Sequence, residues 1–182
     1  MEKFIRIVDR ISNIFGIIAG IFIILGMVLV LVEIVARSIF NSTIYISGEY
    51  SGYFMVAISF LGLAYTLKEK GHIRMTFLHQ LKLFQGGKPR IFLDMYSFLI
   101  GMIFFIIITI ITSMFVWDSL VTGTKSIQIS MTPLFIPQSA IPIGSFLITL
   151  QFFTQFLQTI QKLRQGKVNE YEFEAEDEAL GR

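Results

Sequence analysis

Long uncharged stretches alternate with short charged segments along this chain. The first stretch, 14–32, measures roughly 29 Å as a helix at ~1.5 Å per residue, which matches the ~30 Å hydrocarbon core of a bilayer. Three others follow at 50–67, 95–117 and 126–161. The pattern predicts an all-α integral membrane protein with four transmembrane helices, which we place at about 13–36, 49–67, 93–117 and 141–161.

Two charged segments carry apolar residues at helical spacing, as helices that lie on a membrane surface do. The apolar face of residues 2–12 consists of Phe4, Ile5, Val8 and Ile11. Residues 74–85 repeat the pattern after the second span. We predict amphipathic interfacial helices at both places, in contact with membrane lipids. Packing of these helices on the surface of a partner protein stays open beside that interpretation.

Prolines interrupt the fourth stretch, and each removes a backbone donor and disfavours helix before it. They are Pro133, Pro137 and Pro142. Because this stretch is also longer than one crossing, we expect a short helix or irregular segment up to about Ala140. Residues 1–165 then form a single membrane domain, and the acidic tail at 166–182 is expected to be disordered in solvent.

Composition supports a membrane protein and removes several kinds of chemistry. Hydrophobic residues make up 54% of the chain and charged residues 15%, with a mean hydropathy of +0.70, whereas soluble domains are more polar. The chain has no cysteine, which excludes disulfides, thiolate metal sites and cysteine nucleophiles. The first stretch is long for the apolar region of a signal peptide and is followed by Glu33 and Arg37 instead of a small-residue cleavage pattern, so we interpret it as a retained span.

The distribution of Lys and Arg predicts the orientation of the spans, since positively charged loops stay on the cytoplasmic side. The connections after the first and third spans hold only Arg37 and Lys125. The other basic residues lie in the N-terminal segment, the second connection and the C-terminal tail. We therefore predict that both termini are cytoplasmic.

Charged residues at the ends of the spans are candidates for structural or partner contacts. Glu33 and Arg37 lie four residues apart on one helix face and can pair, while Glu49 begins the second span on the same side and could compete for Arg37. Two roles stay open: a polar contact that sets helix register or binds a partner, and an interfacial anchor whose cost is relieved by snorkelling. Gly16 and Gly20 form a GxxxG face that permits close helix packing.

Catalytic groups are sparse. His72 and His79 are the only histidines, and no carboxylate cluster accompanies them, as a metal site would need. No acid or base falls near the middle of a predicted span, where a proton relay or ion-coupled site would need one. We therefore predict no enzyme activity, no catalytic, cofactor-binding or metal-binding residue, and no nucleic-acid partner. Since internal repeats typical of self-contained transporters are also lacking, the sequence favours an auxiliary subunit.

Short motifs resemble a known family of membrane subunits. RSIFN at 37–41 ends the first span, Glu49 opens the second, FLGLA at 60–64 lies within it, GHIRM at 71–75 follows it, and IPIG at 141–144 opens the fourth. In order and spacing they resemble the DctQ-type small membrane subunit of tripartite ATP-independent periplasmic (TRAP) transporters. The Gly-His-Ile-Arg element is the most specific of these motifs.

The chain departs from the family pattern in two places. Family members often have an aromatic residue and two adjacent acids where this chain has Ile46, Gly48 and Glu49. A tryptophan that often precedes the final span is not matched around Gln138. These departures weaken the case for a special role of the loop before the second span, but they leave the prediction of four spans intact.

The resemblance implies a three-part importer in a bacterial inner membrane. A periplasmic substrate-binding protein captures an organic acid such as a C4-dicarboxylate or sialic acid. A large many-span permease carries the acid inward with sodium by an elevator motion. The small subunit holds that permease as a scaffold, so sodium ions are expected to bind the permease and not this chain.

Structural or partner-contact positions under this resemblance are Arg37, Asn41, Glu49, His72 and Arg74, with Glu33, Gly16 and Gly20 as further candidates from the charge and glycine patterns. None of them is expected to touch substrate. A self-contained homo-oligomeric transporter or channel is the alternative function.

Overall fold

Four long helices and one short helix make up the part of the chain that the computed structural model describes, residues 2–69 and 87–164. They are α1 (Glu2–Phe40), α2 (Ser47–Lys68), α4 (Gly87–Thr122), α5 (Phe135–Gln138) and α6 (Ala140–Arg164). Four helices are long and apolar enough to cross a membrane, which confirms the predicted all-α membrane fold. Within the described residues, extended pairing is confined to an isolated bridge between Lys125 and Pro133.

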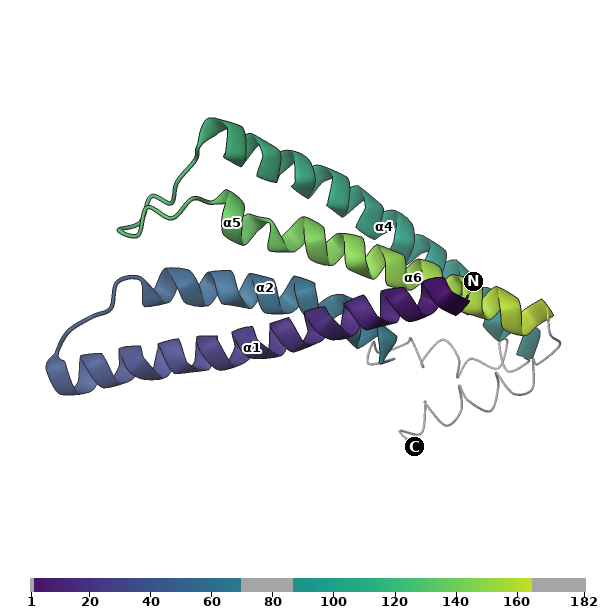
Figure 1. Cartoon of the computed structure of the whole chain (residues 1–182), viewed down its shortest axis with the longest axis horizontal. Coiled ribbons are helices and arrows are strands. Elements are labelled where there is room, and N and C mark those ends of the chain that lie inside the picture. The colour runs from purple at the N-terminus through teal and green to yellow at the C-terminus, as the bar shows by residue number, and fades with distance from the viewer. Residues whose placement is uncertain (1, 70–86, 165–182) are drawn as a thin grey trace.

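The helices lie in a row in the order α1, α2, α6, α4 (Figure 1). α2 packs on both α1 and α6, α4 packs on α6, and α1 touches α6 to a smaller extent. The order of the row explains the burial of each helix. In an apolar stretch of 18 residues within each span, 22% and 33% of the residues are buried in the two middle spans. In the edge spans, in α1 and α4, the corresponding fractions are 6% and 0%.

The two ends of the row differ in what they carry. One end, here called the loop end, holds the connections 41–46 and 123–134 (Figure 1). The other end, here called the terminal end, holds the start of α1 and the end of α6. The two helix pairs α1/α2 and α4/α6 diverge toward the loop end (Figure 1).

Glycines allow the closest approaches between neighbouring helices. A methyl group on Gly144 of α6 would overlap the backbone carbonyl of Phe60 in α2. A methyl group on Gly101 of α4 would lie 2.8 Å from the ring of Phe152 in α6. Small residues let membrane helices approach each other closely. The α2–α6 contact depends on the missing side chain of Gly144, because an added methyl group would meet backbone, whereas at Gly101 it would meet only the end of the Phe152 side chain.

The predicted GxxxG face of α1 is used at one of its two glycines. A methyl group on Gly16 would lie 2.5 Å from the ring of Tyr65 in α2, whereas Gly20 has no atom within 4 Å of that position. Gly16 therefore lies in the α1–α2 contact. Gly20 has open space beside it.

Helix α1 has no break at the predicted boundary between an interfacial helix and the first span. It is continuous from Glu2 to Phe40. Ile5 and Val8 are 9% and 2% exposed, and the ring of Phe4 lies 6.2 Å from that of Phe153 in α6. The residues predicted as a separate helix over 2–12 thus form the first turns of α1, where Ile5 and Val8 are buried within the protein and Phe4, although 40% exposed, lies against α6.

Helix α4 is longer than the predicted span at 93–117. It includes Pro89 in its first turn, where a missing N–H and a fixed φ are compatible with helix. At its other end Gly123 has a φ of 62° and the N–H of Thr124 donates to the carbonyl of Ser119 at 3.1 Å, the arrangement of a glycine C-cap.

The proline-rich stretch contains the short helix α5, and helix α6 begins soon afterwards at Ala140. The apolar segment long enough to cross a membrane runs through both, from Phe135 to Gln161. The predicted interfacial helix at 74–85 and the acidic tail at 166–182 lie outside the described residues.

Replacing Gly144→Ala tests the α2–α6 contact. The new methyl group would meet backbone, so the helices must separate, and we expect a loss of about 1–3 kcal/mol in the free energy of unfolding. Denaturant unfolding in detergent micelles, followed by far-UV circular dichroism, measures it. Gly52→Ala is the matched control, since no atom lies within 4 Å of its added methyl group. A Gly144→Ala protein as stable as the control would contradict the contact.

Candidate functional site

Buried polar side chains concentrate in two layers, one at each end of the row. On α1, Ser12 belongs to the terminal-end layer and Glu33 to the loop-end layer, and both are buried. At about 1.5 Å per residue, about 32 Å of helix separates these two positions. On α2, Glu49 and Lys68 are about 28 Å apart by the same measure. Both spacings are close to the ~30 Å hydrocarbon thickness, so the layers match the two interfaces of a membrane.

Glu33 fastens the first connection to α1. Its Oε1 accepts a hydrogen bond from Nη2 of Arg37 at 2.7 Å, and its Oε2 accepts one from the N–H of Ile44 at 2.8 Å. Glu33 is only 8% exposed, and a buried carboxylate is costly unless its oxygens are bonded. The Arg37 side chain remains 67% exposed. The predicted i,i+4 pair is therefore present, and its cation faces outward.

Asn41 ends α1. Its φ is 49°, in the left-handed region that asparagine enters more readily than most other non-glycine residues. The N–H of Ser42 then donates to the carbonyl of Ala36 at 3.3 Å. The role of Asn41 within the chain is thus to turn the backbone from α1 into the connection.

Glu49 fastens the other connection, 123–134, to α2. Its carboxylate accepts hydrogen bonds from the hydroxyls of Tyr53 and Ser130, each at 2.5 Å, and it is 7% exposed. Beside it, the hydroxyls of Tyr50 and Thr132 lie 3.2 Å apart. The expectation that Glu49 competes for Arg37 is corrected here, because its oxygens bind hydroxyl groups. Sequence reasoning missed Ser130, which lies 81 positions from Glu49.

In the terminal-end layer, Gln151 of α6 binds α1. Its Oε1 accepts from the hydroxyl of Ser12, and its Nε2 donates to Oδ1 of Asp9, both at 3.1 Å. Ser12 and Gln151 are 0% and 2% exposed. The polar ends of the two side chains therefore satisfy each other inside the protein.

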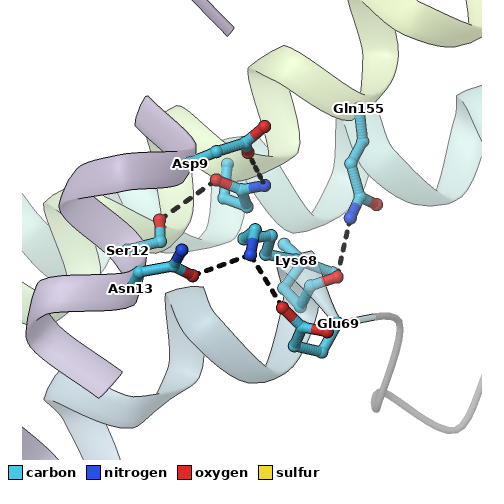
Figure 2. A network of polar contacts seen from close by, with 8 residues as sticks. Asp9, Ser12, Asn13, Lys68, Glu69 and Gln155 are labelled. Carbon is cyan, nitrogen blue, oxygen red and sulfur yellow. Dashed lines mark hydrogen bonds and ion pairs between the residues drawn. The ribbon is translucent and has the colours of Figure 1, made fainter. Parts of the chain in front are cut away.

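Helix α2 joins the same layer through Lys68. Its Nζ donates to Oδ1 of Asn13 and to Oε1 of Glu69, both at 2.7 Å, and the amide of Gln155 donates to the carbonyl of Leu67 at 2.7 Å (Figure 2). Three helices, α1, α2 and α6, thus meet in one polar cluster. Two glutamines four positions apart in the last apolar stretch were the available signal in the sequence.

An apolar cleft of about 360 Å³ lies beside the loop-end layer, between α1, α2 and the α5–α6 segment. Aromatic rings line much of it, including Phe15, Phe22 and Phe54, and the polar atoms come from groups such as Tyr50 and Thr132. No charged side chain lines this cleft. An organic anion would find no cation there.

Glu33, Arg37, Asn41 and Glu49 all lie at the loop end. Glu33 and Arg37 pair with each other, whereas Glu49 binds a different connection. The predicted positions His72 and Arg74 lie outside the described residues. Among residues 2–69 and 87–164, no group of three or more His, Cys, Asp or Glu is placed to hold a metal ion.

A family model described as "Tripartite ATP-independent periplasmic transporters, DctQ component" matches residues 26–162, about three quarters of the chain. The chain belongs to the DctQ family. This DctQ component is accordingly a multi-pass membrane protein and a small subunit of a TRAP transporter, a family of transporter components and not of enzymes. No curated protein matches the chain.

The family match includes the loop-end acids Glu33 and Glu49 as well as Arg37 and Asn41. Gly16 and Gly20 precede the matched residues. TRAP membership implies two partners for the DctQ chain, a large permease subunit and a periplasmic binding protein.

The variants Glu33→Ala and Glu49→Ala test which connection each acid holds. Glu49→Ala is expected to speed amide hydrogen exchange in 123–134 at least about ten-fold, since lost bonds to a buried charged group are worth about 1.5–3 kcal/mol and each ~1.4 kcal/mol is a factor of about ten. Glu33→Ala should instead speed exchange in 41–46. Exchange of both variants is followed by mass spectrometry in detergent. Loosening of the same connection by both variants would contradict the assignment.

Gln151→Leu tests the terminal-end layer. The change keeps the volume but leaves the buried hydroxyl of Ser12 without this partner, so we expect the unfolding free energy to fall by about 1–3 kcal/mol. Denaturant unfolding in micelles measures the effect. Gln158→Leu, at an exposed position of the same helix, is the control. Equal stability of the two variants would contradict a stabilising role for the cluster.

Proposed function

We propose that this DctQ component is the scaffold subunit of a sodium-coupled importer of organic acids in a bacterial inner membrane. It stabilises a large elevator-type permease, and a periplasmic protein delivers the substrate. The observation that carries the proposal is the family match over residues 26–162. The geometry of the helix row supports it in two ways.

The first support is the open surface of the row. The apolar windows of the edge spans in α1 and α4 are 6% and 0% buried within the chain. Large exposed side chains along them include Ile24, Val28, Ile107 and Ile111. Since membrane helices associate by packing and by hydrogen bonds between side chains, these two edges offer area to a many-span partner.

The second support is the chemistry of the polar groups. In both Glu33 and Glu49, each of the two carboxylate oxygens accepts a hydrogen bond from another group of the same chain. The cleft beside them has no charged lining. This arrangement suits a structural subunit, and the proposal accordingly assigns sodium and substrate to the permease.

The distribution of basic residues supports an orientation in which the loop end faces the periplasm. Arg37 lies at the end of α1 and Lys125 in the connection after α4, whereas the other basic residues that the structure describes lie in the first turns of α1, at the end of α2, at the start of α4 and at the end of α6, toward the terminal end. By the positive-inside rule the terminal end is then cytoplasmic. The connections 41–46 and 123–134 are, in this orientation, the surfaces available to the periplasmic binding protein.

Purification through a C-terminal tag tests the proposal. Membranes are solubilised in mild detergent, and proteins that remain bound are identified by mass spectrometry. A stoichiometric many-span permease is expected, because a scaffold must stay attached to what it holds. Cells that express the permease without this chain should lose uptake while any residual uptake keeps the same ranking of organic acids. A homo-oligomer without a partner, or a changed ranking, would overturn the scaffold role in favour of a self-contained transporter or channel.

A further inference from the structure

An open apolar groove of about 540 Å³ runs along the exposed surface of α1 and α2 toward the loop end. Gly26 and Val30 of α1 and Gly48 and Gly52 of α2 contribute to its lining, with no charged residue among the lining groups. No atom lies within 4 Å of the point where a side chain of either α2 glycine would begin. The groove is therefore hollow because those side chains are missing.

The groove is separate from the contacts already described. Glu49 follows Gly48 directly in sequence, but it does not line the groove and its carboxylate binds Ser130 and Tyr53. Successive residues of a helix point in different directions, about 100° apart at 3.6 residues per turn. The groove thus uses a face of α2 other than the face that holds the connection 123–134.

A cation continues the groove toward the loop end. Gly26, Val30 and Arg37 are spaced by four and seven residues, which places them on one face of α1. Arg37 begins about 9 Å beyond Leu31, the last α1 residue of the groove lining, at about 1.5 Å per residue. It also binds Glu33 of the loop-end layer. The groove therefore lies at hydrocarbon depth and the guanidinium at the depth of lipid head groups.

We propose that this groove binds one phospholipid, with an acyl chain in the groove and the phosphate on Arg37. The guanidinium has five donors in a fixed fork. It gives one nitrogen to Glu33, and its side chain is 67% exposed, so a phosphate can approach it while the pair with Glu33 persists. Arginine binds phosphate through short, charge-assisted hydrogen bonds.

Charge complementarity selects this occupant over a partner helix. An apolar helix would fill the groove but would supply no anion for the cation at its end. A phospholipid supplies both parts in one molecule, an apolar acyl chain and, at the level of the head groups, a phosphate. Since bulk lipid is as apolar as the groove lining, preference for a particular lipid must come from the phosphate contact and from the hollow over Gly48 and Gly52. The inference does not rest on the proposed scaffold function.

Lipid binding by the full chain, expressed without a permease, tests the proposal. Native mass spectrometry of the protein in detergent follows titration with dioleoylphosphatidylglycerol and with dioleoylglycerol, which has the same acyl chains but no phosphate. We expect saturable binding of one phosphatidylglycerol per chain and about ten-fold weaker binding of dioleoylglycerol, the change expected for loss of one charge-assisted hydrogen bond. Arg37→Gln should remove this difference.

Filling the groove separates its role from that of the cation. Gly52→Leu is expected to weaken binding of both lipids, since its side chain occupies the hollow, and Gly48→Leu serves as a second variant if the first does not fold. Ser113→Leu adds the same side chain to an exposed position of α4, outside the groove, and should bind as the unchanged protein does. Circular dichroism and elution volume check that each variant is folded.

Two outcomes would overturn the proposal. Equal binding of the two lipids by the unchanged protein would contradict a contact between the phosphate and Arg37. Unchanged lipid binding by both glycine variants would exclude the groove as the lipid site. Loss of a co-purified permease in the same variants would then identify a partner helix as the occupant of the groove. Absence of any permease from the tagged chain would contradict the scaffold function alone, because the lipid titration uses the chain without a partner.

Discussion

The contact between α2 and α6 holds the two helix pairs of this protein together. Gly144 lies against the backbone of Phe60, and Ala64 and Ile148 beside it are 0% exposed. Apolar area alone drives little association between helices in lipid, since lipid tails are as apolar as the side chains. Close approach and the dispersion contacts that it permits must therefore supply much of the attraction, and they depend on small residues at this crossing.

Two polar layers set the register of the helices around that contact. Gln151 joins α6 to α1 at the terminal end, and Glu49 joins the connection 123–134 to α2 at the loop end. Each group is buried and bonded, so a shift of one helix along another would leave a buried polar atom unpaired, which costs about 1–3 kcal/mol. The layers therefore resist sliding, which suits the proposed scaffold role.

The row leaves its edges open, and this openness connects the fold to the proposed roles. A closed bundle would bury the apolar faces of all four spans, whereas here α1 and α4 keep most of theirs exposed. A DctQ component with two open edges has surface for the proposed permease contact. Along α1 and α2 it also has an uncharged groove, with the exposed cation of Arg37 beyond its end, as the proposed lipid site requires. Neither role needs a catalytic group.

The sequence by itself determined the features that depend on neighbours along one helix. Four spans follow from uncharged lengths, the pair of Glu33 and Arg37 follows from a spacing of four residues, and family membership follows from motif order. Only the tertiary structure decided which helices adjoin. The bonds of Glu49 to Ser130 and of Ser12 to Gln151 join positions 81 and 139 apart, and no periodicity in the chain encodes such pairs. The apolar face of residues 2–12 shows the reason most clearly: the same side chains suit a membrane surface or a protein surface, and the position of α6 selects between them.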